Sequence, residues 1–460
     1  MNLLDINTGD TAWVLVSAAL VLLMTPALAF FYGGMVRAKG VLNMMLMSVV
    51  TMGIVGVLWV LFGFSMAFGE SWRGLVGNPL QFAGLRSTFD IAVGADGHQI
   101  PLLVFAGFQA AFAIIAVALV SGAVADRMKF GAWIAFATAW AVLCYFPAAH
   151  WVFAFDGYVA EHGGWIANTV KAFDFAGGTA IHINAGAAAL ALALVVGPRV
   201  GFGSTPMRPH NLTLVMLGAG LLWFGWFGFN AGSALSAGPL AGLAWINTLV
   251  AAAAAMLAWL AVERIRDGHA TSLGAASGIV AGLVGITPAC AVVTPMGAIA
   301  VGVLAGAACA CALELKYRFG VDDSLDVVGV HLVGGLVGTL AVGLFADGVL
   351  SGGSAGLFYG GGLEQLGRQA IGAFAVLAYS LVVSLVIAKL IDMTIGLRVD
   401  GRSEATGIDL GEHAETGYDL SKVQYSSYGV AKSLVLPASP ASPVDATNLS
   451  NTAADLEATR

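Results

Sequence analysis

Long apolar stretches separated by short polar segments dominate this chain, and they limit the folds open to it. Runs of about 20 apolar residues are long enough to cross the hydrocarbon core of a bilayer as helices. Because irregular backbone cannot face lipid with unsatisfied polar groups, such runs must be helices or closed barrel strands, and their length selects helices. The chain is 58% hydrophobic and only 10% charged, whereas soluble domains carry about 25% charged residues. We therefore predict an all-α, multi-pass membrane protein in a lipid bilayer.

Eleven such stretches predict eleven transmembrane helices. They fall near 11–33, 41–68, 101–125, 130–153, 177–197, 211–231, 240–262, 272–290, 296–316, 326–346 and 368–391. An odd number of spans places the two termini on opposite sides of the membrane.

The distribution of basic residues predicts the orientation of these helices. Most fall on one side of the scheme: Arg37, Lys39, Arg127, Lys129, Arg199, Arg208, Arg264, Arg266, Lys316, Arg318, Lys389, Arg398 and Arg402. The other side has only Arg73, Arg86, Lys171 and, at the edge of a span, Arg368. Because cytoplasmic loops are enriched in Lys and Arg, we predict that the N-terminus lies outside and the C-terminal tail in the cytoplasm.

Two of the predicted helices carry similar sequences. The stretch GGTAIHINAGAAALAL lies in the fifth span and VVGVHLVGGLVGTLAV in the tenth, and aligning His182 with His331 matches their small residues. Helices five spans apart run in opposite directions, as an inverted repeat requires, and such repeats place a substrate site near the bilayer midplane. We predict an inverted repeat of five helices over about 11–197 and 211–346, followed by a last helix at 368–391.

The composition becomes polar and acidic beyond about Leu397. We divide the chain into a transmembrane domain over 1–397, a cytoplasmic tail over 398–435 and a segment over 436–460 that we expect to be disordered. This last segment is rich in Pro, Ser and Ala without apolar periodicity. Segments of that kind bury too little apolar surface to fold.

Two histidines lie inside apolar helices, where ionisable residues are costly and therefore candidates for function. A single such histidine is often a packing residue, but His182 and His331 occupy matching places in the two halves. Two imidazoles that meet can share one hydrogen between ring nitrogens, and they can then pass a proton or bind a small polar molecule. A metal site is the weaker alternative because no third ligand lies nearby, so we expect no metal and no cofactor.

Aromatic residues lie near the outer ends of two spans. Phe108 and Phe112 in AGFQAAFAII, and Phe229 and Ser233 in GWFGFNAGSA, are each spaced to share one helix face. Rings from two helices could stack across a pore and close it to water, and their faces could hold a cation with about 0.5–2 kcal/mol. Ordinary packing is the alternative interpretation.

Other functional classes find little support in the residues. The four cysteines lie in or beside apolar runs and indicate neither a disulfide framework nor a zinc site. The spans contain no nucleophile with a base and no carboxylate pair, so an enzyme is not predicted. No basic patch suggests a nucleic-acid partner.

Several segments together resemble one known family. FYGGMVRAKGVLN, AFAIIAVALVSGAVADR, DFAGGTAIHINAGAAAL, GWFGFNAGSA, AGLVGITPACA and DVVGVHLVGGLVG resemble signature segments of the ammonium transporter family, the bacterial and plant branch related to the Rhesus proteins. They occur in the family's order over roughly residues 10 to 400. The resemblance implies a homotrimer in the cell membrane, in which each subunit of eleven spans encloses its own pore. It also implies a cytoplasmic partner, a small nitrogen-signalling protein of the PII class.

The resemblance implies roles along the pore. His182 and His331 match the family's twin histidines, and Phe108 and Trp226 match aromatic residues that line the route.

The resemblance also implies a recruitment site at the outer mouth. Phe112 and Phe229 match the stacked gate, Ser233 matches a residue that hydrogen-bonds ammonium, and Asp174 matches a carboxylate that stabilises the outer vestibule and helps recruit the cation. The sequence departs from the family at Phe153, where a tryptophan is usual. Because Trp binds cations better than Phe, we expect weaker recruitment unless Trp151 or the loop 154–173 compensates.

These roles predict how the protein works. Ammonium is recruited at the outer aromatic site and deprotonated, and ammonia passes through the pore, with electrogenic transport as the leading expectation. The alternatives are an ammonium sensor of the same fold and an electroneutral channel of the Rhesus kind.

Overall fold

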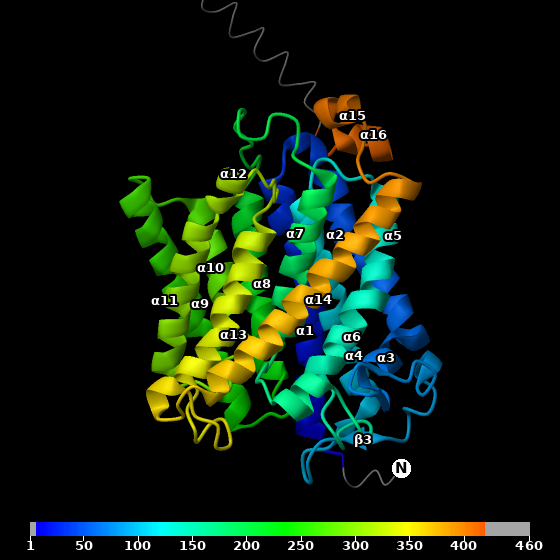
Figure 1. Ribbon diagram of the computed structural model, residues 1–460, viewed down its shortest axis with the longest axis vertical. Helices are drawn as coiled ribbons and strands as arrows, with labels where there is room; N and C mark the ends of the chain where they lie inside the picture. The colour runs from blue at the N-terminus through cyan, green and yellow to red at the C-terminus, as the bar shows by residue number, and fades with distance from the viewer. Residues whose placement is uncertain (1–5, 419–460) are drawn as a thin grey trace, which may run out of the picture. The chain divides into compact units, whose positions relative to one another are not determined.

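The computed structural model describes residues 6–418, which form a bundle of helices (Figure 1). Ten helices among these residues are long and apolar enough to cross a membrane. Large apolar side chains lie exposed on their outward faces, as with Val57, Leu257 and Val382 at 61%, 63% and 59% exposure. Apolar surface of this extent is a liability in water and is expected where lipid covers it. The prediction of a mainly helical, multi-pass membrane protein is therefore confirmed.

The ten spans are built from consecutive helices, with η marking 3-10 and π-helical turns. They are Thr8–Met35 (α1), Ala38–Phe68 (η2, Ala38–Gly40; α2, Val41–Leu58; η3, Trp59–Gly63; α3, Phe64–Phe68), Leu102–Val124 (α4, Leu102–Val120; η5, Ser121–Val124), Phe130–Phe153 (α5, Phe130–Trp140; η6, Ala141–Tyr145; α6, Phe146–Phe153), Gly178–Val196 (η8, Gly178–Ile183; α7, Asn184–Val196), Leu212–Gly232 (α8), Pro239–Arg266 (α9), Pro295–Phe319 (α11, Pro295–Ala312; α12, Leu315–Phe319), Val328–Phe345 (η9, Val328–Leu332; α13, Val333–Phe345) and Glu364–Thr394 (α14).

The predicted eighth span is a shorter helix than expected. We predicted it over 272–290, whereas α10 covers Ser272–Ile286 and has 15 residues. Pro288 lacks the N–H that would continue the helix, although the apolar run goes on past it. The total of eleven spans stays a prediction.

Local chemistry explains where several helices begin. The side chains of Asn211, Thr271 and Thr294 accept hydrogen bonds from backbone N–H groups in the first turns of α8, α10 and α11. Such N-caps satisfy donors that the helix itself leaves free. Pro239 and Pro295 occupy first-turn positions of α9 and α11, where the missing N–H of proline costs nothing.

Glycines bring α9 and α11 into backbone contact. A Cβ built on Gly302 would lie 2.3 Å from the carbonyl oxygen of Ala251, and one built on Gly306 would lie 2.3 Å from that of Ala255. Only a hydrogen fits at these two positions, so the helices approach closely, as small-residue pairs allow in membranes.

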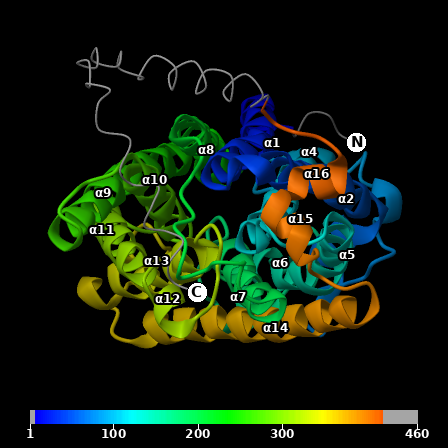
Figure 2. The same ribbon diagram turned by 90° about the horizontal axis from the view of Figure 1, so that it is seen from above.

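The two ends of the bundle differ in what they carry. The first turn of α1 lies at one end together with two short antiparallel strand pairs, β1 (Ser71–Trp72) with β2 (Val76–Gly77) and β3 (Ala92–Val93) with β4 (Ile100–Pro101) (Figure 1). The short helices α15 (Gly401–Thr406) and α16 (Ile408–His413) lie at the opposite end (Figure 1). We call these the α1 end and the tail end. Helix α14 runs obliquely along one side of the bundle, against α7 and α13 (Figures 1 and 2).

Residues 398–413 pack onto the tail end. The Asp409 carboxylate accepts hydrogen bonds from the backbone N–H groups of Leu42 and Asn43 at 3.0 and 2.8 Å. His413 is hydrogen-bonded to the Asn43 side chain at 2.9 Å, and Glu412 accepts from the backbone N–H of Phe130. The described part of the predicted tail is thus held by the first turns of α2 and α5. The predicted remainder, 419–435, and the segment 436–460 lie outside the described residues.

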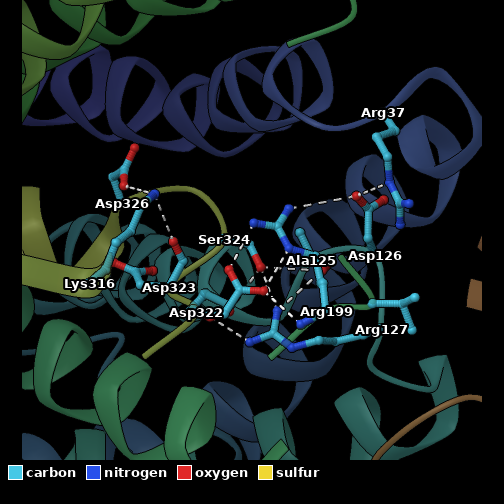
Figure 3. A network of polar contacts seen from close by, with 12 residues as sticks. Arg37, Ala125, Asp126, Arg127, Arg199, Lys316, Asp322, Asp323, Ser324 and Asp326 are labelled. Carbon is cyan, nitrogen blue, oxygen red and sulfur yellow. Dashed lines mark hydrogen bonds and ion pairs between the residues drawn. The ribbon is translucent and has the colours of Figure 1, made fainter. Parts of the chain in front are cut away.

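A buried network of charged groups (Figure 3) also lies at the tail end, where the backbone N–H of Val399 donates to the Arg127 carbonyl at 3.0 Å. Arg199 forms a two-pronged ion pair with the Asp322 carboxylate, through Nε and Nη2 at 2.8 Å each. Arg127 donates to the Asp322 backbone carbonyl at 2.6 Å, and Arg37 pairs with Asp126 at 2.9 Å. These bonds join the short segments that connect the spans. Ion pairs and hydrogen bonds therefore hold the tail end together in addition to packing.

Candidate functional site

Two helices bring His182 and His331 together in the middle of the bundle. Each histidine lies in a π-helical turn, η8 or η9, at the start of its span. A Cβ on Gly186 would lie 2.5 Å from the backbone nitrogen of Leu332, and a Cβ on Gly335 would lie 3.0 Å from the carbonyl oxygen of Gly178. The two helices therefore touch backbone to backbone beside the imidazoles.

The two imidazoles form a hydrogen-bonded pair. Their Nδ1 atoms are 3.2 Å apart, and the rings lie nearly parallel with centroids separated by 5.3 Å. Both side chains are buried, with 1% and 4% exposure. In a neutral pair one Nδ1 donates and the other accepts, so one Nε2 bears a hydrogen and the other a lone pair. The pair can hold one additional proton, but two would place N–H groups against each other.

A small apolar cavity surrounds this pair. Its volume is about 20 Å³, and a cavity of about 10–15 Å³ is enough for one water-sized molecule. It is lined by Met24, Leu28, Phe31, Tyr32, Ile115, Leu119, His182, Leu222, Trp226, Phe229, Val280 and His331. The buried His182 Nε2 has no hydrogen-bond partner in the protein. The cavity therefore offers one small polar solute a binding atom in otherwise apolar surroundings.

Trp226 fixes one face of the His182 ring. The indole and imidazole stack with a centroid distance of 5.5 Å and an angle of 20°. The indole N–H donates to the Thr287 hydroxyl at 2.9 Å, and Thr287 in turn donates to the Leu283 carbonyl at 2.7 Å. Thr287 was not among the predicted site residues.

Phenyl rings separate this cavity from a second one. Phe112 and Phe229 lie against each other with centroids 4.4 Å apart, and Phe108 packs edge-on to Phe112 at 4.8 Å. All three are at most 2% exposed. Phe229 lines the histidine cavity and Phe112 lines the other one. The two rings therefore stand between the cavities.

The second cavity, which we call the vestibule, has a volume of about 610 Å³. Four predicted recruitment residues share its wall, namely Phe112, Phe153, Asp174 and Ser233. The structure thus brings together all of these residues, which come from four separate segments of the chain.

The Asp174 carboxylate is fully engaged by backbone donors. One oxygen accepts from the N–H groups of Gly177 and Gly178, and the other from those of Thr179 and Ala180, at 2.7–3.1 Å. This places a negative charge at the start of the helix that carries His182, where it complements the helix dipole. Asp174 can therefore attract a cation by its field while its hydrogen-bonding capacity is already used.

Trp151 does not replace the tryptophan missing at position 153. Its indole donates to the Leu75 carbonyl at 2.7 Å and packs on Trp165 and Tyr379, and it does not line the vestibule. Tyr158, from the loop 154–173, does line it. Burial raises the pKa of Tyr158 to about 12, so at neutral pH it presents a neutral ring and hydroxyl.

Further polar groups in the vestibule went unpredicted. Gln109 lines it next to Phe108 in the chain, and a lone amide in an apolar helix is a signal that could have been used. Two basic residues, Lys171 and Arg368, also line the vestibule, and Arg368 pairs with Glu364.

Within residues 6–418 no group of three or more His, Cys, Asp and Glu side chains could hold a metal ion. Cys144, Cys290 and Cys309 are buried, whereas Cys311 is exposed on α11. The described site combines imidazoles and aromatic rings with the Ser233 hydroxyl, the Gln109 amide and the Asp174 carboxylate.

Comparison with known proteins gives a consistent result. The family model described as Ammonium Transporter Family matches residues 12–418. An ammonium transporter of Mycobacterium tuberculosis is 60% identical over 449 residues, covering 93% of this chain and 92% of the relative. An ammonium transporter of Bacillus subtilis is 44% identical over 416 residues, covering 90% of this chain and 99% of the relative.

Solved structures agree with the sequence comparisons. The structure of Saccharomyces cerevisiae Mep2 superposes with a TM-score of 0.77 at 32% identity, covering 86% of this chain and 88% of that one. A structure titled Sensor Amt Protein superposes with a TM-score of 0.80 at 29% identity, covering 90% of this chain and all of that one.

Proposed function

Because this chain belongs to the ammonium transporter family, we propose that it carries ammonium across the cell membrane by moving ammonia and a proton through the histidine cavity. The observation that carries the proposal is the 3.2 Å contact between the two Nδ1 atoms inside an apolar cavity of about 20 Å³. Such a site suits a small neutral solute that can hydrogen-bond. It offers no ring of oxygen atoms to replace the water of an alkali ion.

The energetic reason is the cost of desolvation. Moving an intact cation into a dry pore costs on the order of 20 kcal/mol by the idealised Born estimate. Ammonium can avoid most of this cost by releasing a proton, whereas potassium has none to release. The neutral imidazole pair then supplies hydrogen-bond partners and can accept the released proton, because it tolerates one excess proton.

Recruitment takes place in the vestibule. The faces of Phe112 and Phe153 and the hydroxyl of Ser233 surround an ammonium ion there, while Asp174 attracts it without direct contact. The Ser233 hydroxyl donates to the Phe229 carbonyl at 2.8 Å, which leaves its oxygen lone pairs for the N–H groups of ammonium. Phe112 and Phe229 act as the gate that the solute passes after losing its proton.

The charged loops support the orientation that we propose. The α1 end, with the vestibule, faces outward and the tail end faces the cytoplasm, since Arg37, Arg127 and Arg199 gather at the tail end (Figure 3). This is the positive-inside arrangement. The matching π turns that contain His182 and His331 support an inverted repeat. In this scheme α10 is the eighth of eleven spans.

Assembly and regulation complete the proposal. The subunit forms a homotrimer, and residues 398–435 are the regulatory tail to which a PII-class signalling protein docks. Support comes from the docking of 398–413 onto the first turns of α2 and α5, where a bound protein could hold or release the inner ends of these helices.

An ammonium sensor is the second candidate, because the chain resembles the structure titled Sensor Amt Protein. A sensor would bind ammonium without sustained flux. An electroneutral channel of the Rhesus kind is the third candidate, and it would carry ammonia without charge.

Reconstitution into liposomes distinguishes these functions. An ammonium gradient should drive a current across the membrane, and an equal potassium gradient should not. Uptake of ammonium without current would indicate the electroneutral channel. Binding of ammonium without uptake or current would indicate the sensor, and failure to bind ammonium at all would reject the whole proposal.

A further inference from the structure

The symmetry of the two histidines extends to a pair of aspartates. Asp174 lies eight residues before His182, and Asp323 lies eight residues before His331. Each precedes the π turn that begins its span, one at the α1 end and the other at the tail end. The two carboxylates are therefore equivalent in sequence, but their surroundings differ.

The carboxylate at the tail end is only partly satisfied. Oδ2 of Asp323 accepts a hydrogen bond from the Val328 N–H at 2.6 Å, whereas the buried Oδ1 has no partner. The residue is 3% exposed. A buried acceptor without a partner is costly and needs an explanation. Asp174, by contrast, uses both oxygens for backbone donors.

Nearby charges leave the Asp323 carboxylate without a cation of its own (Figure 3). Lys316 pairs with the carboxylate of Asp326 and donates to Asp323 only at its backbone carbonyl, at 3.3 Å. Arg127, which also acts electrostatically with Asp323, is bonded to Ser324 and to the Asp322 carbonyl. Burial and then the charge of Asp326 raise the pKa of Asp323 to about 6, although Lys316 opposes this.

Tyr32 links the segment that carries Asp323 to the histidine cavity. Asp323 and Asp326 act electrostatically on the Tyr32 hydroxyl, and Tyr32 lines that cavity together with His331. A Cβ on Gly122 would touch both the Tyr32 ring, at 2.7 Å, and the Val327 side chain, at 2.8 Å. Tyr32 thus lies between the histidine cavity and the segment that carries Asp323.

Resting on the function proposed above, we propose that Asp323 is the proton-exchange group at the cytoplasmic end of the transport path. A proton leaves the histidine pair through water in the inner half of the pore. It binds to the free Oδ1 of the ionised carboxylate and forms a carboxylic acid. The O–H bond then breaks, the proton passes to cytoplasmic water, and the carboxylate is restored.

This assignment makes transport sensitive to cytoplasmic pH. Above about pH 6 the Asp323 carboxylate is ionised and can accept a proton. Below that pH the carboxylate is already protonated from the cytoplasm and cannot accept a proton from the pore. The current should therefore fall as the cytoplasm becomes more acidic. Asp174, with all its acceptor positions in use, should give the outer side no matching response.

The test is a whole-cell recording in which the pipette solution sets the cytoplasmic pH while external pH and ammonium stay fixed. The wild-type current should fall along a titration curve centred near pH 6. Asp323→Asn keeps an oxygen for the Val328 N–H but cannot accept a proton. We expect it to lose at least tenfold in current and to lose the pH response. Asp323→Glu restores a carboxylate and should restore both.

Asp326→Asn is the matched control variant. It also provides a test of the proposal if Asp323→Asn fails to fold. Removing this neighbouring charge should lower the midpoint by up to roughly one pH unit, because like charges disfavour ionisation. An unshifted midpoint, an Asp323→Asn protein with wild-type current and pH response, or a loss that Asp323→Glu does not restore would each overturn the assignment. A wild-type protein without any ammonium current would instead reject the proposed function.

Discussion

The indole N–H of Trp226 donates to the hydroxyl of Thr287, and the same indole stacks on the imidazole of His182. One hydroxyl on α10's C-terminal side therefore sets the plane of a ring on α8, which in turn limits the rotation of the histidine. Because His182 Nε2 has no partner in the protein, its direction depends on this stacking and on the Nδ1 contact with His331.

Thr287→Val should therefore impair transport while the fold persists. The substitution keeps the shape but leaves the buried indole N–H unsatisfied, at a cost of about 1–3 kcal/mol, which the indole can avoid by turning away from His182. We expect about a tenfold loss of ammonium current and a changed pH profile. Thr287→Ser, which keeps the hydroxyl, should behave like the wild type. A Val variant with lowered melting temperature but unchanged current and pH profile would show that the bond only supports packing.

Phe153→Trp should strengthen ammonium recruitment. Phe153 lines the vestibule, and an indole face attracts a cation more strongly than a phenyl face, with cation–π contacts worth about 0.5–1 kcal/mol at exposed sites. The apparent KM for ammonium should fall by about two- to fivefold with little change in maximal current. Phe155→Trp, in the same wall, is the control for added bulk. A KM that does not change, or changes equally in both variants, would speak against recruitment at position 153.

Replacing both histidines by alanine should abolish the selective current. The His182→Ala, His331→Ala double variant loses the hydrogen-bonded pair and widens the cavity. A tenfold loss corresponds to about 1.4 kcal/mol of barrier, and we expect at least that, with reduced selectivity over potassium in any residual current. Currents in liposomes under ammonium and potassium gradients measure both quantities. An undiminished ammonium-selective current would exclude proton transfer through the histidine pair.

Asp322→Asn should destabilise the protein far more than a matched surface change. It removes the two-pronged carboxylate partner of the buried Arg199 guanidinium and leaves only the longer 3.8 Å contact with Asp126, and breaking a buried ion pair costs about 3–5 kcal/mol. Asp267→Asn, in the exposed pair with Arg266, should have little effect, because water screens exposed ion pairs. Thermal unfolding of purified protein in detergent compares the two, and equal melting temperatures would contradict the expectation.

The same ion pair makes stability depend on pH. Burial of Asp322 opposes ionisation, but the hydrogen bond and charge of Arg199 outweigh it, and the pKa of Asp322 is lowered. Its stabilising contribution is therefore present above the ordinary aspartate pKa of about 3.9 and is lost as the pH falls through the lowered value. Melting temperatures across acidic pH should show this loss in the wild type and not in Asp322→Asn.

Asp409→Ala should release the tail without unfolding the bundle. Asp409 caps the first turn of α2 through two backbone N–H groups, and loss of a cap typically costs about 1 kcal/mol. We expect faster proteolytic cleavage within 398–413 and unchanged melting of the spans. Asp400→Ala, which caps only α15, is the control for tail helicity. If both variants are cleaved at the wild-type rate, the Asp409 contact does not hold the tail.

Much of the fold followed from apolar run lengths. The predicted span 130–153 corresponds to the observed Phe130–Phe153, and 177–197 to Gly178–Val196. Larger errors arose where helices extend beyond the apolar core. The last helix was expected from 368 but begins at Glu364, because charged residues continue a helix into the aqueous region without adding to the apolar count.

The site was predicted less evenly. Pattern and resemblance singled out His182, His331 and Trp226, and the structure brings their rings together, but Thr287, which holds Trp226 in place, was missed. Thr287 lies in the segment ITPACA, where a threonine before a proline is typical of an ordinary helix end. Its partner Trp226 is 61 residues away in sequence, and contacts across such separations appear only when the helices are packed.

The backbone contact at Gly186 and Gly335 bears on how this passage can operate. A Cβ at Gly186 or Gly335 would meet main-chain atoms of the facing helix, so the separation of the two histidine-bearing helices is set there by backbone contact. Widening the passage enough for a hydrated ion would require the two helices to move apart. In the transport path proposed above, this fixed helix separation would exclude hydrated ions, and control of flux would fall to the two mouths of the path.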